Sequence, residues 1–142
     1  PQEIAMKLSP YLSFDGQCEA AFKFYEQCFG GKTESLMPYK DSPMADEVSA
    51  EWETKVMHGE FKLGDDVLMG SDCMPGKYEA AKGTYIMVAI NDPDKAEKSF
   101  NALAEGGTVT MPIEKTFWAA KFGTLIDQFG IPWMINCEQP AE

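Results

Sequence analysis

The chain has 142 residues, of which 44% are hydrophobic and 25% charged, as is ordinary for one globular domain. Its 23 acidic and 12 basic residues give a net charge of −11, a sign that repels nucleic-acid backbones and anionic membranes, so neither is an expected partner. No apolar run approaches the roughly 20 residues of a membrane span, and no secretory leader is apparent. We therefore expect a soluble, cytoplasmic, single-domain protein.

The first half of the chain reads as a strand, a helix and three further strands. Apolar residues recur at i, i+4, i+7 and i+11 over residues 18–29, which predicts a helix, and Gly64-Asp65-Asp66 predicts a hairpin turn. Residues 38–54 lack periodicity, so we expect either a solvated connector or a mobile loop that acts as a lid or dimer contact. The expected strands are residues 8–14, 32–37, 56–63 and 67–71.

The second half repeats this order after a linker at residues 74–82. Asp92-Pro93 is a helix-start signal, and the apolar stripe that follows ends at Gly106-Gly107, which aligns without a gap with Gly30-Gly31. Neither half can bury both faces of its sheet alone, so the sequence predicts an α+β fold of two paired βαβββ modules, at about 6–74 and 83–138. The second set of expected strands is residues 84–90, 108–113, 121–128 and 131–136.

Four cysteines are scattered along the chain without a C-x-x-C pair or a histidine at zinc-site spacing. Cys18 and Cys28 would lie about 15 Å apart on one helix, too far to form a disulfide with each other. We interpret the cysteines as buried, reduced side chains, with a reactive thiol as the alternative. They are Cys18, Cys28, Cys73 and Cys137.

Several segments resemble a known family, and together they cover nearly the whole chain. Pro10-Tyr11-Leu12, residues 16–25, Val56-Met57-His58-Gly59 and residues 68–72 resemble the PhnB-like branch of the vicinal oxygen chelate superfamily, which includes glyoxalase I, extradiol dioxygenases and bleomycin-resistance proteins. The longest matching stretch runs over residues 106–136.

The resemblance implies that the two modules form a cupped mixed sheet around a cavity that binds a small molecule. It also implies a homodimer, sometimes formed by exchange of modules. Members of this branch often carry a demethylubiquinone methyltransferase label, but the sequence does not support methyl transfer. A Rossmann-type methyltransferase needs a glycine-rich turn after a strand to approach its cofactor, and no G-x-G-x-G segment follows any expected strand.

Metal-dependent members of the superfamily place His, Glu or Gln ligands on the first and last strands of each module. The corresponding positions here fall near Pro10, Ser71, Thr84 and Met134, and a shift by one residue would offer Asp72 and Tyr11. Catalytic sites for Zn, Fe(II), Mn or Ni usually use three or more His or carboxylate ligands. We therefore predict no cofactor and no metal centre, with a divalent metal as the alternative.

The single histidine, His58, is the candidate catalytic residue, because an imidazole titrates near neutral pH and suits a general base. Strand alternation places Val56, His58 and Glu60 on one face, which would offer a His–carboxylate pair. The alternative is a structural, hydrogen-bonded histidine.

The aromatic residues and one acid of the second half offer further candidates. Phe117, Trp118, Phe122 and Trp133 could stack a planar ligand near a cavity or pack the core or dimer seam. Asp127 could be a buried acid or a carboxylate that caps a turn. The full set of predicted pocket residues is Tyr11, His58, Ser71, Trp118, Phe122 and Trp133.

Three functions remain open at this stage. The first is a metal-free small-molecule-binding protein, the second a divalent-metal-dependent lyase, isomerase or dioxygenase, and the third an interaction module that works through the loop at residues 38–54 and a dimer surface. We favour the first.

Overall fold

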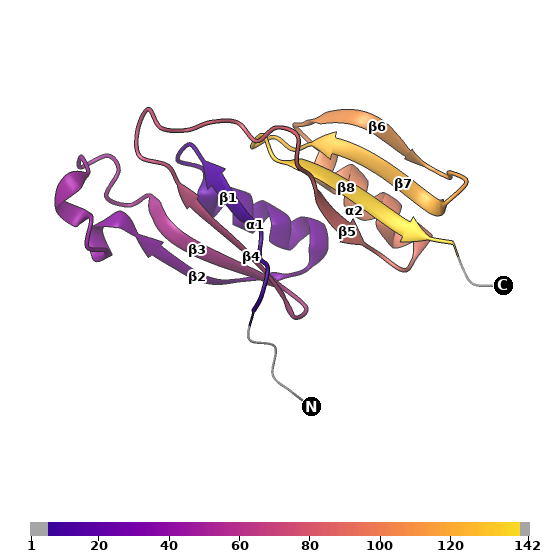
Figure 1. Cartoon of the computed structure of the whole chain (residues 1–142), viewed down its shortest axis with the longest axis horizontal. Helices are drawn as coiled ribbons and strands as arrows, with labels where there is room; N and C mark the ends of the chain where they lie inside the picture. The colour runs from indigo at the N-terminus through magenta and orange to yellow at the C-terminus, as the bar shows by residue number, and fades with distance from the viewer. Residues whose placement is uncertain (1–5, 140–142) are drawn as a thin grey trace. The chain divides into compact units, whose positions relative to one another are not determined.

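The computed structural model describes residues 6–139, which pack into two compact units. The first unit runs up to Phe22 and continues over Gly31–Tyr78, and the second comprises Lys23–Gly30 and the chain from Glu79 onward. Each unit has one four-stranded sheet, and the order strand, helix, three strands occurs twice along the chain (Figure 1). The predicted repeat of two βαβββ modules is confirmed.

The first sheet has the strand order β1-β4-β3-β2, with β1 parallel to β4 and the other pairs antiparallel. The first strand is shorter than predicted, because the pairing with β4 begins only at Tyr11, and Leu8 lies fully exposed before it. The elements are β1 (Tyr11–Phe14), α1 (Cys18–Phe29), β2 (Lys32–Pro38), β3 (Val56–Leu63) and β4 (Asp66–Asp72).

A buried carboxylate, that of Asp72, joins the elements of the first unit. Its Oδ1 atom accepts a hydrogen bond from the backbone N–H of Cys18 at 2.9 Å, and its Oδ2 atom accepts one from Val56 at 2.8 Å. A carboxylate suits the first turn of a helix, where the N–H groups lack partners within the helix. Asp72 thus fixes the start of α1 and the start of β3 at the end of β4.

The loop between β2 and β3 contains two short 3₁₀ helices, η1 (Tyr39–Asp41) and η2 (Ala45–Glu47). The buried hydroxyl of Tyr39 donates to the Asp72 carbonyl oxygen at 2.6 Å, and burial together with the Asp72 carboxylate raises the pKa of Tyr39. Trp52 donates from its indole to the Cys73 carbonyl. The loop is therefore joined to the end of β4 at two points, and its role as a lid or dimer contact stays a prediction.

The second unit repeats the sheet, with the order β5-β8-β7-β6 and β5 parallel to β8. Asp92 caps α2 by accepting from the N–H groups of Asp94 and Lys95, as its position before proline predicts. Gly30 and Gly106 follow the helix ends with positive φ, the left-handed conformation in which many helices end. The elements are β5 (Ile86–Ala89), α2 (Pro93–Ala104), β6 (Thr108–Glu114), β7 (Ala119–Ile126) and β8 (Pro132–Glu138).

The core of the second unit contains a second buried carboxylate, that of Asp127. Its Oδ1 atom accepts from the backbone N–H groups of Phe129 and Ile131, so it caps the turn between β7 and β8 as predicted. Its Oδ2 atom accepts from the Tyr25 hydroxyl at 2.5 Å and from the Trp133 indole at 2.9 Å. The end of α1 is thereby joined to the turn and to β8, and the ring centroids of Tyr25 and Trp133 lie 5.1 Å apart.

Three of the four cysteines are buried, as predicted, and Cys73 is half-buried. All four are free thiols. Burial raises the pKa of Cys28 to about 11, and the carboxylates of Asp127 and Glu105 add to the shift. Each of the two described α-helices has 12 residues, and no helix among the described residues is long and apolar enough to cross a membrane.

We predict that Tyr25→Phe lowers the free energy of unfolding by about 1.5–3 kcal/mol, the usual scale for a hydrogen bond to a charged group. The substitution keeps the ring in the core but removes one of the four donors to Asp127. Urea denaturation followed by fluorescence measures the difference. Tyr85→Phe is the matched control, because Tyr85 is 42% exposed. Equal stability of the two variants would contradict the role given to this network.

Candidate functional site

The sheet of the first unit has one face covered by α1 and one open face. Leu68, Gly70 and Asp72 are buried along β4, whereas Met69 and Ser71, which alternate with them, are half-exposed. Tyr11 pairs with Met69 across the sheet, so its side chain points to the same open face. The open face is thus defined by every second residue, as expected of a strand with one face in the core.

His58 and Glu60 both lie on this open face, as the alternation along β3 predicts. The accompanying prediction for Val56 is wrong, because Val56 is buried on the helix side. In the pairing of β2 with β3, Met37 faces His58 and Pro38 faces Val56, which leaves Met57 without a partner. Such a bulge reverses the side on which the preceding residue points.

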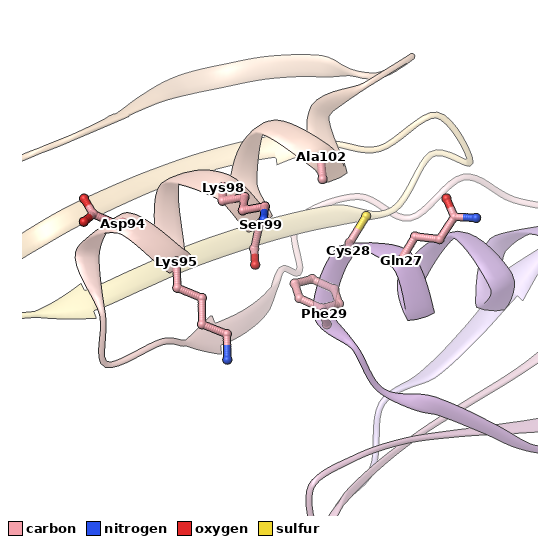
Figure 2. Close-up of a pocket in the computed structure, with 8 residues that line it drawn as sticks. All are labelled: Gln27, Cys28, Phe29, Asp94, Lys95, Lys98, Ser99 and Ala102. Atoms are coloured by element: carbon pink, nitrogen blue, oxygen red, sulfur yellow. The ribbon is translucent and has the colours of Figure 1, made fainter.

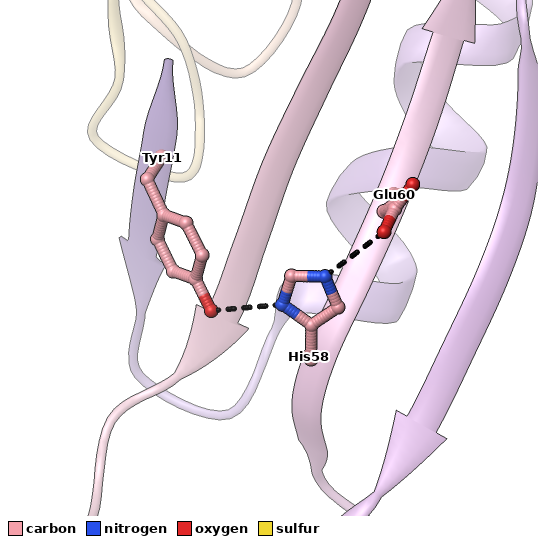
Figure 3. A network of polar contacts seen from close by, with 3 residues as sticks. All are labelled: Tyr11, His58 and Glu60. Carbon is pink, nitrogen blue, oxygen red and sulfur yellow. Dashed lines mark hydrogen bonds and ion pairs between the residues drawn. The ribbon is translucent and has the colours of Figure 1, made fainter. Parts of the chain in front are cut away.

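The three polar side chains of Tyr11, His58 and Glu60 form one chain of contacts (Figure 3). The Tyr11 hydroxyl lies 3.2 Å from His58 Nδ1, and His58 Nε2 lies 3.1 Å from Glu60 Oε2. A carboxylate has no proton to donate, so the contact with Glu60 requires a proton on Nε2, and in the tautomer that has its one proton there Nδ1 accepts from the phenol. A neutral imidazole therefore satisfies both contacts. The side chains of His58 and Glu60 are 29% and 38% exposed, so solvent and ligands reach them.

The direction of the hydrogen bonds among Tyr11, His58 and Glu60 determines which kind of ligand can bind to them. In the tautomer with the proton on Nε2, the Tyr11 hydroxyl donates to His58 Nδ1, and the phenol oxygen keeps lone pairs that can accept a hydrogen bond from a ligand. A proton given to Tyr11 can pass to His58, and the Glu60 carboxylate stabilises the imidazolium that results. The arrangement favours a ligand with a hydroxyl or N–H donor.

The donor set does not fit the metal centre of the superfamily. Within residues 6–139, no three His, Cys, Asp or Glu side chains lie close enough together to hold an ion. His58 and Glu60 could supply only two ligands to a metal ion, and both imidazole nitrogens are already in contact with neighbouring side chains. Asp72 points to the helix side, where its carboxylate binds backbone N–H groups. First-row dications usually require a third His or carboxylate.

The other residues predicted at metal-ligand positions add no such donor. Pro10 lies just before β1, and its carbonyl accepts from Met69. Thr84 lies exposed before β5, and Met134 is half-buried on β8. The structure thus offers no imidazole or carboxylate at these three positions.

The six predicted pocket residues occupy three places. Tyr11, His58 and Ser71 share the open face of the first unit. The rings of Trp118 and Phe122 lie edge to face beside the turn between β6 and β7 in the second unit, with centroids 5.4 Å apart, and the centroids of Phe117 and Trp118 lie 4.7 Å apart. Their role in ligand binding stays a prediction.

Trp133, the sixth residue, packs in the core, as the alternative interpretation of these aromatic residues states. It is 3% exposed, its ring lies 5.4 Å from that of Phe29, and its indole donates to Asp127. The side chain of Trp133 therefore lies on the helix side of β8, within the core of the second unit.

Two methionines on the open face, Met37 and Met69, were not among the predicted residues. Met69 pairs with Tyr11, and Met37 pairs with His58. Alternation along residues 67–71 could have identified Met69 from the sequence, since it alternates with buried residues. Met37 could not be found in this way, because its neighbour on β3 depends on the bulge.

Comparison with known proteins shows the family to which the chain belongs. The sequence pattern of the family described as 3-demethylubiquinone-9 3-methyltransferase matches residues 6–136. Protein YjdN from Escherichia coli strain K12 is 31% identical over 147 residues, which cover 96% of this chain and 100% of that protein.

Two solved bacterial structures have a similar fold. Protein PA1353 from Pseudomonas aeruginosa has a TM-score of 0.86 at 45% identity, over 96% of this chain and 100% of that one. A Bacillus cereus protein described as a putative 3-demethylubiquinone-9 3-methyltransferase, PhnB protein, has a TM-score of 0.78 at 24% identity, over 93% and 99% of the two chains.

A likeness of fold alone extends further, to a glyoxylase/bleomycin resistance protein/dioxygenase domain from Frankia sp. EAN1pec. It has a TM-score of 0.66 at 8% identity, over 96% of this chain and 100% of that one. The chain belongs to the 3-demethylubiquinone-9 3-methyltransferase family and has the fold of a glyoxylase/bleomycin resistance protein/dioxygenase domain.

Proposed function

We propose that this chain binds a small molecule with a hydroxyl or N–H donor on the open face of its first sheet, without a metal centre. The chain of contacts from Tyr11 through His58 to Glu60 carries this proposal, because it combines an exposed acceptor with a group that can take up a proton. Ser71 and Met69 lie on the same face and supply one more polar group and an adaptable apolar surface.

On the open face of the first sheet, charge favours a ligand that donates hydrogen bonds rather than an anion. The sequence has twelve lysines and no arginine, so it lacks the guanidinium fork that binds carboxylates and phosphates in bidentate fashion. Glu60 adds a carboxylate to the site itself. An anionic ligand on this face would meet a negative side chain and a protein of net charge −11.

We do not extend the family's methyltransferase description to this chain. The two sheets are four-stranded and mixed, with one parallel pair each. A Rossmann-type methyltransferase uses a mostly parallel sheet with a glycine-rich turn at a strand end. The observed fold supports binding in the manner of the glyoxalase/bleomycin-resistance group instead.

A thermal-shift screen of small hydroxyl and amine metabolites tests the proposed site. At a concentration ten times its Kd, a ligand of the native protein should raise Tm by roughly 4 °C. Tyr11→Phe and His58→Gln should abolish the shift, since each breaks the chain of contacts. Tyr85→Phe, a change at an exposed tyrosine of the second unit, should retain it. A ligand whose shift survives both site variants would refute this location.

Elemental analysis of protein purified without chelators tests the absence of a metal centre. We expect far less than one equivalent of Zn, Ni, Mn or Fe per chain, because His58 and Glu60 are only two donors. One equivalent that is lost in His58→Ala would overturn this part of the proposal. It would favour a divalent-metal-dependent lyase, isomerase or dioxygenase instead.

We also propose that the chain forms a homodimer through the open face of its second sheet. On that face, Met87 and Met111 are 55% and 44% exposed, and Trp118 in the adjoining turn is 50% exposed. Exposed large apolar side chains gathered on one face are characteristic of an interaction site. A second copy would remove it from water.

Light scattering coupled to size-exclusion chromatography tests this proposal. We expect twice the mass of the chain for the wild type and the mass of one chain for Met87→Glu/Met111→Glu. The buried face would then have to accommodate two charges, at a large cost. Leu8→Glu is the control, because Leu8 lies outside both sheets. A monomeric wild type would disprove the dimer.

A further inference from the structure

A cavity of about 500 Å³ lies within the second unit, between the end of α1 and one side of α2 (Figure 2). It is separate from the open sheet faces, since its walls are helical. On α2, Lys95, Ser99 and Ala102 follow one another at i, i+4 and i+7, so they share the side that lines the cavity. A volume of this size is within the usual range for small-molecule sites.

The floor of the cavity is formed by uncharged side chains, two of which are short. Ser99 and Ala102 have short side chains, which leave room between the helices, and Phe29 and Cys28 face them from α1. Cys28 is 7% exposed, and burial holds its pKa at about 11, so the thiol carries no charge at neutral pH. An apolar body therefore suits this floor, with the Ser99 hydroxyl as one polar contact.

The rim of the cavity carries the charge. Lys95 and Lys98 are exposed residues that lie three positions apart, and their apolar stems can line the wall while the ammonium groups remain in water. Asp94 is the one carboxylate of the lining, and Gln27 is neutral. The lining thus has two lysines against one aspartate, and the carboxylates of Asp127 and Glu105 lie near enough to Cys28 to raise its pKa.

We propose that this cavity is a second binding site, which takes a small organic carboxylate with an aromatic or medium-chain apolar body. The body lies against Phe29, Cys28 and Ala102, and the carboxylate lies at the rim between the ammonium groups of Lys95 and Lys98. The site differs in place and in charge preference from the open face of the first sheet, whose contacts favour a hydrogen-bond donor. The two proposals therefore stand or fall independently.

Benzoate titrated into ¹⁵N-labelled protein, followed by NMR, tests the site. Saturable shifts are expected for the amides of Gln27–Phe29 and Lys95–Ala102, which lie along the two walls. Benzamide, which has the same ring without the charge, should bind far more weakly. Shifts confined to Tyr11, His58 and Ser71, or equal affinity for benzamide, would overturn the proposal.

Two variants separate charge from shape. Lys95→Gln/Lys98→Gln should weaken benzoate binding by roughly fivefold, the scale of two partly exposed ion pairs. Lys62→Gln/Lys82→Gln removes the same charge from exposed positions outside the cavity and should leave the affinity unchanged. Ala102→Leu should block the cavity while keeping the spectrum of the first unit. Equal effects of the two lysine pairs, or full binding by Ala102→Leu, would refute the site.

Discussion

The hydrogen bonds of the Asp72 carboxylate hold the candidate site in place from the opposite side of the sheet. One oxygen fixes the first turn of α1 and the other fixes the first residue of β3. His58 lies two residues after Val56. Because Met57 between these two residues is unpaired, the imidazole ring of His58 points to the open face. Tyr11 comes from β1, the other neighbour of β4. A carboxylate on the helix side of the sheet therefore helps to position the phenol and the imidazole on the open face.

The two modules have the same fold, but their open faces differ in chemistry. The first carries the polar chain of Tyr11, His58 and Glu60, whereas the second carries half-exposed methionines and aromatic rings. Thr124, which lies on the second face, bonds Thr110 at 2.6 Å rather than a titratable group. Repetition of the fold has thus preserved the strand order while the exposed positions diverged, because packing constrains only the helix side of each sheet.

Much of the fold could be predicted from the sequence, since helix periodicity, Asp92-Pro93 and the glycines after each helix are local signals. The position of Val56 could not, because one unpaired residue inside a strand changes the face and leaves no mark in the local pattern. The shared face of His58 and Glu60 needed only alternation. The contact of Tyr11 with His58 required the register across β4, which depends on pairing rather than on local sequence.

In the second unit, the position of Trp133 likewise could not be predicted from local sequence. An aromatic residue on a last strand could face either side, and its partners Tyr25 and Asp127 come from distant parts of the chain. No local pattern joins residues that lie 102 positions apart. The cavity between the two helices was missed for the same reason, since it depends on how the end of α1 lies against α2.

The division of α1 between the two units has a consequence for synthesis on the ribosome. Tyr25 precedes its partner Asp127 by 102 residues, so at about 5–20 residues per second it leaves the ribosome roughly 5 to 20 s earlier. The first unit can close in that interval, but the aromatic rings at the end of α1 cannot yet meet Trp133. The nascent chain therefore displays a short apolar helical segment until its last strand emerges, and this segment is where chaperone contact and premature association would concentrate.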